Sequence, residues 1–209
     1  MKLYDFKPAP SPRRVRIFLA EKNVSLPTQQ VDLRQGDQMQ EWFLRLNPWA
    51  TVPVLELDDG TAISEASACC RYLEEVYPDP PLLGRTPTEK GVVAMWDHRC
   101  EIDGFLAVAE AFRNKTPGMK DRALPGVFGF PQLPELAERG RLRVGHFIER
   151  LDQRLAETEY VAGDTFTVAD ITALIAIDFA GWLKIAIPPD RPHLARWHAA
   201  VSARPSAAA

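Results

Sequence analysis

Short apolar runs and longer periodic runs alternate over the first third of the chain, which predicts a small sheet covered by helices. Lys2 to Phe6 is expected to be a strand, and a helix follows in which Val15, Phe18 and Leu19 recur at helical spacing. The remaining expected elements are a strand at Pro27 to Leu33, a helix at Gln38 to Leu46, a hairpin with strands at Val54 to Leu57 and Thr61 to Ile63, and a helix at Glu65 to Val76. The predicted order of strands and helices is therefore βαβαββα.

A cluster of prolines and glycines separates this part from a remainder in which every periodic run is helical. The cluster comprises Pro78, Pro80, Pro81, Gly84 and Pro87. Beyond it, helices are expected at Glu89 to Arg113, Glu135 to Thr158, Thr167 to Lys184 and His193 to Ala203. We therefore predict an α/β domain at residues 1–78, a linker at 79–88 and an all-α domain at 89–209.

Two helices of the second domain carry informative patterns. At the start of one of them, Thr167 and Asp170 are spaced as an N-cap and its reciprocal partner, with Phe166 and Ile171 placed for a hydrophobic staple. This pattern is expected to serve folding and not chemistry. The other helix carries an apolar stripe formed by Met95, Ile102, Phe105, Ala109 and Phe112.

The charge balance limits the binding partners that can be expected, and the cysteine content indicates the cellular compartment. Lys and Arg number 25 against 28 Asp and Glu, so the net charge of -3 gives no reason to expect a nucleic acid or an anionic membrane as partner. The longest apolar stretch, Ile171 to Ile187, is interrupted by Asp178 and Lys184, which favours a buried helix over a membrane span. Three cysteines without a CxxC pair, and no leader pattern before the first strand, predict reduced thiols in a cytoplasmic protein.

A proline stands directly before an apolar strand in the segment NPWATVPVL, which begins at Asn47. Since proline cannot donate to a sheet ladder, Pro53 is expected to open the strand. A cis bond between Val52 and Pro53 would turn the N–H and C=O of Val52 outward as a free peptide-binding edge. The alternative is an edge-strand proline without a binding role.

An acidic residue opens the helix that follows the hairpin, in the segment ISEASACCRYLEE from Ile63. The Glu65 carboxylate could hold an ammonium group, while the free N–H groups of the first helical turn could hold a carboxylate. Together these groups would fit an α-amino acid. The alternative is an ordinary acidic helix start, which the helix dipole favours.

The order of these segments resembles the cytosolic glutathione transferase family over nearly the whole chain, and in particular its atypical bacterial, theta- or zeta-like and yeast-like members. The resemblance rests on the β-loop-α start, the two segments just quoted, the proline-rich linker and the all-helical remainder. It implies a thioredoxin-like first domain in which Val52, before cis-Pro53, pairs with the cysteinyl backbone of glutathione. Glu65 and the adjoining turn, with Ala66 and Ser67, would hold the γ-glutamyl end. Ala66 departs from the family pattern, which usually has Ser or Thr after the acidic residue.

The first helix begins at Ala9-Pro10-Ser11-Pro12, where thioredoxin-like redox proteins carry a CxxC motif. Ala9 and Pro12 occupy the two cysteine positions, which excludes dithiol exchange at this turn. In the resembled family, the hydroxyl or thiol that activates glutathione would often fall at Ala9. Ser11 is the nearest hydroxyl and is the candidate catalytic residue, with a water or His98 as other candidates for activating the thiol. The alternative is that Ser11 only caps the helix.

For several other side chains, a structural role is an alternative to a role in function. Cys69 and Cys70 lie in mid-helix and are expected to be small buried side chains, not reactive thiols. His98, Ile102 and Phe105 are candidates for an electrophile pocket, while the alternative for His98 is a surface position. The tryptophans are expected to serve packing and not substrate contact, and no metal site is expected.

The function implied by the resemblance is attack of the glutathione thiolate on a small apolar electrophile, with glutathione as co-substrate. The resemblance also implies a homodimer. Two alternatives remain open at this point. One is a non-catalytic interaction module that kept the same fold, and the other is a glutathione-dependent isomerase or disulfide reductase.

Overall fold

The computed structural model describes all 209 residues, and its first part has the predicted βαβαββα order. The second strand is shorter than expected, because only three of its residues, Thr28 to Gln30, pair with the first strand. The elements are β1 (Lys2–Asp5), α1 (Pro10–Glu21), β2 (Thr28–Gln30), the 3-10 turn η1 (Asp37–Met39), α2 (Glu41–Leu46), β3 (Val54–Glu56), β4 (Ala62–Ser64) and α3 (Ala66–Val76).

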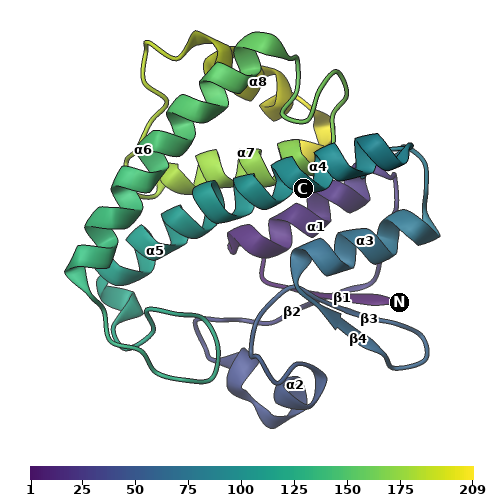
Figure 1. The fold of residues 1–209 in the computed structure, drawn as a ribbon. Helices are drawn as coiled ribbons and strands as arrows, with labels where there is room; N and C mark the ends of the chain where they lie inside the picture. The colour runs from purple at the N-terminus through teal and green to yellow at the C-terminus, as the bar shows by residue number, and fades with distance from the viewer.

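The four strands form one mixed sheet in the order β2-β1-β3-β4, in which β1 and β2 are parallel and the other neighbours antiparallel. Helices α1 and α3 lie between the sheet and the helical domain, and α2 lies on the opposite face (Figure 1). Side chains alternate between the faces. Leu3 and Leu55 enter the main core, whereas Tyr4 and Val54 pack with Phe43 of α2 in a second, smaller core.

The chain beyond α3 is built from helices, which confirms the predicted fold class. None of the helices combines the length and the apolar character that a membrane span requires. The elements are α4 (Pro87–Arg99), the π-helical segment η2 (Cys100–Phe105), α5 (Leu106–Lys115), the 3-10 turn η3 (Pro117–Met119), α6 (Pro134–Glu157), α7 (Val168–Gly181), α8 (Pro192–Ser202) and the 3-10 turn η4 (Pro205–Ala208).

The helix expected from Glu89 to Arg113 is present without a break, but its middle, η2, is π-helical and not α-helical. A Cβ atom at Gly104 of η2 would lie 2.7 Å from the ring of Phe147, so only glycine permits this close packing against α6. The wider π turns shift the buried face relative to a regular helix. Met95 and Ile102 of the expected stripe are exposed, whereas Phe105 is buried.

The main core runs without a break from the first domain into the second. Its buried side chains come from α1 and α3 as well as from α4 to α8. Helix α7 packs against α1, as Figure 1 shows, and is buried along nearly its whole length. The predicted capping pattern is present at its start, where the Asp170 carboxylate accepts the N–H of Thr167 at 2.9 Å.

Candidate functional site

The three segments selected from the sequence meet at one edge of the sheet. Strand β3 lies between β1 and β4. Its first residue, Val54, pairs with Tyr4 of β1 on one side and with Ser64 of β4 on the other. The end of β1, the start of β3 and the end of β4 therefore lie side by side. Because Ser11 follows β1, Val52 precedes β3 and Glu65 follows β4, the fold brings these residues to the same edge.

The Val52 peptide group at this edge has no hydrogen-bond partner within the chain. The Val52–Pro53 bond is cis, as the family resemblance implied. Neither the N–H nor the C=O of Val52 takes part in a backbone hydrogen bond, and the ladder of β3 begins only at Val54. The preceding loop is fixed by Asn47, whose Nδ2 donates to the carbonyl of Thr51 at 2.9 Å. A fixed loop with a free peptide group is suited to pairing with an extended backbone.

Glu65 combines an unusual backbone conformation with a free carboxylate. Its φ of 71° is rare for a residue with a side chain, and its exposed carboxylate makes no hydrogen bond to the start of α3. The N–H groups of Ala66, Ser67 and Ala68 have no acceptor within the chain. Strained backbone of this kind concentrates at ligand sites. A free carboxylate beside three free N–H groups offers partners to both ends of an α-amino acid.

Ser11 is the second residue of α1 and does not cap the helix. The N-cap is Ala9, and no side chain accepts the first N–H groups of α1. The hydroxyl oxygen of Ser11 accepts a hydrogen bond from Arg14 Nη2 at 3.1 Å. Because Pro10 and Pro12 lack an N–H, Ser11 alone among the first three residues of α1 has one. The capping alternative is therefore excluded, and the hydroxyl proton has no acceptor within the chain.

The cysteines of the chain do not supply a reactive thiol. Cys69, Cys70 and Cys100 are buried and unpaired, as predicted for the first two. Burial raises the pKa of Cys69 to about 12 and raises the pKa of Cys70 and Cys100 well above the ordinary value. Thiol chemistry at the sheet edge therefore requires a thiol from a bound molecule.

A cavity of about 150 Å³ lies between the start of α1 and helix α7. Trp182 at its wall is 53% exposed and packs edge-on against Phe179, with ring centroids 5.1 Å apart. Trp182 therefore takes part in packing, as expected, and also leaves part of its ring exposed at the cavity. The lining residues are Lys7, Pro8, Ala9, Pro10, Arg13, Ile175, Asp178, Phe179 and Trp182.

An ion pair joins the two domains at this cavity. Arg13 Nη1 donates to Asp178 Oδ2 at 2.6 Å, and His198 Nε2 lies 2.9 Å from Asp178 Oδ1. Partial burial acts to raise the pKa of Asp178, but the hydrogen bonds from His198 and Arg13 outweigh it and lower the pKa. In the sequence, Asp178 could be noticed because it is an acidic residue within an otherwise apolar helix.

The three residues expected to form an electrophile pocket lie outside this cavity. His98 and Ile102 are exposed, and Phe105 is buried against Phe179 with ring centroids 5.8 Å apart. The exposed position of His98 agrees with its surface alternative. The cavity is formed by α7 residues that sequence reasoning missed, because only the packing of α7 on α1 brings them to the loop after β1.

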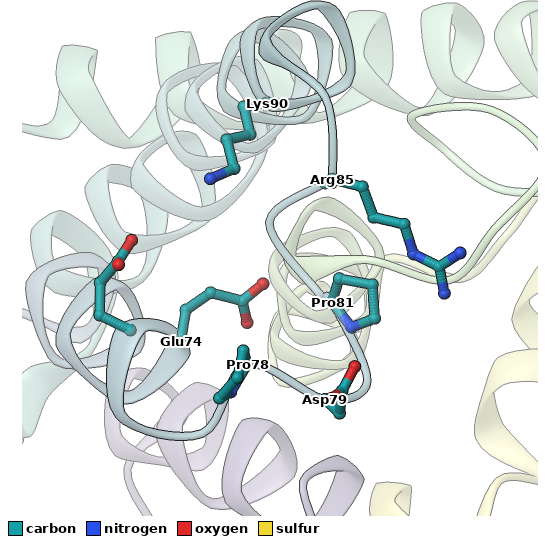
Figure 2. Close-up of a pocket in the computed structure, with 8 residues that line it drawn as sticks. Glu74, Pro78, Asp79, Pro81, Arg85 and Lys90 are labelled. Atoms are coloured by element: carbon teal, nitrogen blue, oxygen red, sulfur yellow. The ribbon is translucent and has the colours of Figure 1, made fainter.

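A larger cavity, of about 330 Å³, lies at the linker between α3 and α4 (Figure 2). Five of its eight lining residues are charged, and Pro78 and Pro81 are the only apolar side chains, so it does not suit an apolar ligand. The carboxylate of Glu74 already lies 2.5 Å from the buried ammonium of Lys22 and accepts backbone N–H groups of the linker. Structural contacts therefore account for its central charged group.

Comparison with known families identifies two matching domain models. The model described as glutathione S-transferase, N-terminal domain, matches residues 9–76. The model described as glutathione S-transferase, C-terminal domain, matches residues 96–205. The two matches lie on the α/β part and on the helical part, respectively.

Individual relatives match nearly the full chain. Glutathione S-transferase 2 of Saccharomyces cerevisiae is 39% identical over 208 residues, which cover 99% of this chain and 87% of that protein. The crystal structure of Gtt2 from the same yeast has a TM-score of 0.91 at 38% identity, with coverage of 99% and 98%. A glutathione S-transferase domain-containing protein of Marinobacter aquaeolei has a TM-score of 0.92 at 40% identity and covers 99% of both chains.

Proposed function

The chain belongs to the glutathione S-transferase family, in its yeast-like Gtt2 subgroup, and uses glutathione as co-substrate; we propose that the sheet edge at Val52, Pro53 and Glu65 holds the glutathione. The observation that carries this proposal is the set of unpaired groups at that edge. The N–H and C=O of Val52 pair with the cysteinyl backbone, and the Glu65 carboxylate accepts the α-ammonium group. The first N–H groups of α3, from Ala66 and Ser67, donate to the α-carboxylate.

Ala66 supplies no hydroxyl at the position where the family usually has one. Its side chain is buried against the core, so it contributes only its N–H. Ser67 is half-buried and adds both an N–H and a hydroxyl. The free N–H groups of α3 therefore replace the missing side-chain contact, and the helix dipole favours a carboxylate at this end.

Glutathione supplies the thiol that attacks the electrophile. Lowering a thiol pKa from about 8.5 to about 6.5 requires roughly 2.7 kcal/mol of preferential stabilisation of the thiolate. A helix terminus supplies about 0.3 to 1 kcal/mol, and one hydrogen bond to a charged group about 1.5 to 3 kcal/mol. The start of α1 alone is insufficient, so we assign Ser11 as the donor to the sulfur.

The electrophile is proposed to lie in the cavity between the start of α1 and α7. Ala9, Pro10, Phe179 and Trp182 give this cavity an apolar and aromatic wall next to Ser11. Such a wall suits a small apolar compound, and an aromatic ring would stack on the exposed face of Trp182. This placement replaces the expected pocket at His98, Ile102 and Phe105.

We also propose that the protein acts in detoxification as a cytoplasmic homodimer. The family membership supports this assembly. Large apolar side chains left on the surface also support it. Trp49 and Phe128 are 71% and 72% exposed, and both would be favourable to bury against a second copy.

Calorimetric titration with glutathione tests the binding site. Glu65→Ala removes a charged hydrogen-bond acceptor, which predicts about 10- to 150-fold weaker binding from a loss of about 1.5 to 3 kcal/mol. Glu75→Ala is the matched control, because Glu75 is an exposed glutamate of the same helix, away from the sheet edge. Equal affinity in Glu65→Ala and Glu75→Ala would refute the assignment.

The titration of the bound thiol, followed by thiolate absorbance, tests Ser11. Ser11→Ala is expected to raise the thiol pKa in the complex by about 1 to 2 units, with little change in glutathione affinity. The thiols of the chain do not interfere, since burial holds the pKa of Cys69 at about 12 and those of Cys70 and Cys100 well above the ordinary value. An unchanged titration in Ser11→Ala, with a shifted one in His98→Ala, would transfer the role to His98.

A further inference from the structure

Arg14 is a buried arginine that connects Ser11 to the helical domain. Its side chain is only 5% exposed, although it carries a charge. Nη2 donates to Ser11 Oγ at 3.1 Å, and Nη1 lies 3.2 Å from the carboxylate of Glu101 in η2. The guanidinium also lies over the ring of Phe105, 4.6 Å from its centroid. One side chain therefore contacts both domains directly beside the proposed thiol donor.

The burial of Arg14 is costly for the fold. A buried charge is tolerated when it is paired, but Nε of Arg14 is buried and has no hydrogen-bond partner. Its partner Glu101 lies in the π-helical segment, a type of turn that occurs frequently at functional sites. An ion pair of purely structural value is readily replaced by apolar side chains, so this arrangement calls for a further role.

The hydrogen-bond capacities of the two side chains fix the direction of the Ser11 contact. Arginine has only donors, whereas a serine hydroxyl has one proton and two acceptor lone pairs. Ser11 Oγ is therefore the acceptor from Arg14, and its own proton remains free for another acceptor. A cationic donor on the oxygen also polarises the hydroxyl and makes it a stronger donor.

We propose that Arg14 is a positioning residue, held by Glu101 of the helical domain, that orients the Ser11 hydroxyl so that its proton faces the sulfur of bound glutathione. The inference rests on the proposed role of Ser11. The thiol loses its proton to solvent, and the negative charge on sulfur is stabilised by the O–H of Ser11. A carboxylate of the second domain thereby takes part in setting thiol ionisation in the first.

Arg14→Lys separates positioning from charge. A lysine keeps the positive charge, but its single nitrogen cannot serve Ser11 and Glu101 from two separate atoms as the guanidinium does. In the glutathione complex, the thiol pKa read from thiolate absorbance should rise by about 0.5 to 1 unit in Arg14→Lys. In a Ser11→Ala background the same substitution should produce no further rise, since the residue through which it acts is gone.

Arg204→Lys is the matched control. Arg204 pairs with Glu21 at the far end of α1, with Nη2 2.7 Å from the carboxylate, and lies 4.1 Å from the ring centroid of Phe166. Like Arg14, Arg204 therefore has a carboxylate partner and an aromatic neighbour, but it does not contact Ser11. Arg204→Lys should lower the thermal stability to a degree comparable with Arg14→Lys and leave the thiol pKa unchanged.

The outcomes distinguish this inference from the proposed function. If Ser11→Ala leaves the thiol pKa unchanged, the assignment of Ser11 as donor is wrong and the role of Arg14 is overturned with it. If Ser11→Ala raises the pKa but Arg14→Lys does not, only the inference about Arg14 is overturned. An additive rise in the double variant, or an equal rise in Arg204→Lys, also overturns it. If Arg14→Lys does not fold, Arg14→Met, which fills the same space without a donor, must raise the pKa at least as much.

Discussion

Asp170 is the buried carboxylate on which the start of α7 depends. Its side chain has no exposed surface and accepts hydrogen bonds from the N–H of Val161, the N–H of Thr167 and Nε1 of Trp197, each at 2.9 Å. These donors come from the loop before α7, from its N-cap and from α8. One carboxylate therefore connects three segments of the helical domain.

Asp170→Asn tests the strength of this network. The amide keeps one acceptor oxygen and places an NH₂ group against the donors that the second oxygen served. If the remaining oxygen still accepts the hydrogen bonds from Val161 and Trp197, the N–H of Thr167 is buried without a partner. An unsatisfied buried donor costs about 1 to 3 kcal/mol, and we expect the free energy of unfolding at pH 7 to fall by that amount.

The pH dependence of stability provides a second, independent readout. Burial, against the effect of its hydrogen bonds, raises the pKa of Asp170 from 3.8 to about 6. At pH 7 both the folded and the unfolded states are ionised. As the pH falls from 7 to 4.5, the folded protein binds a proton at Asp170 that the unfolded chain does not, so this group adds stability on acidification. The gain is about 2 kcal/mol at pH 4.5, and Asp170→Asn lacks it.

Urea unfolding of both proteins at pH 7 and pH 4.5, at a fixed protein concentration, measures these two effects. The difference in unfolding free energy between wild type and Asp170→Asn should be about 2 kcal/mol larger at pH 4.5 than at pH 7. Asp178 and Glu21, whose pKa values are lowered, act in the opposite direction, but they are present in both proteins and cancel. An equal difference at the two pH values would refute the raised pKa of Asp170, and no difference at pH 7 would refute the network.

Two further predictions concern the electrophile cavity and the assembly. Trp182→Ala should raise KM for an aromatic electrophile about 2- to 12-fold, from a lost stacking contact of about 0.5 to 1.5 kcal/mol, with glutathione affinity unchanged. Trp42→Ala, at an exposed tryptophan on α2, is its control, and equal KM changes in both would place the electrophile elsewhere. Light scattering at micromolar concentration should give twice the 23.4 kDa of one chain, and a mass near 23.4 kDa would rule out the homodimer.

Local patterns in the sequence determined the fold class and selected the sheet edge that we propose binds glutathione. Pro53 before an apolar strand was recognised as the start of that strand, and the cis bond that the family resemblance implied is present. The helix start at Glu65 was also recognised, because an acidic residue followed by small residues is a local signal. The order of these segments along the chain identified the family, which the comparisons show independently.

The same patterns were incomplete where packing between distant segments matters. The helix expected from Glu89 to Arg113 is present but contains a π-helical segment, in which Gly104 approaches Phe147 of α6. Periodicity along one helix carries no information about a neighbour that lies far away in the sequence. Met95 and Ile102, which periodicity placed on an apolar stripe, are exposed in the structure.

The chemistry of Ser11 shows most directly what only the tertiary structure decided. The sequence placed a hydroxyl at the start of α1 and left open whether it caps the helix. The arginine that donates to Ser11 is three residues away, but the carboxylate that holds this arginine is Glu101 of the helical domain. Local residue types determine which groups are available at a site, whereas the partners that fix their charge and hydrogen-bond direction come from segments that only the folded chain brings together.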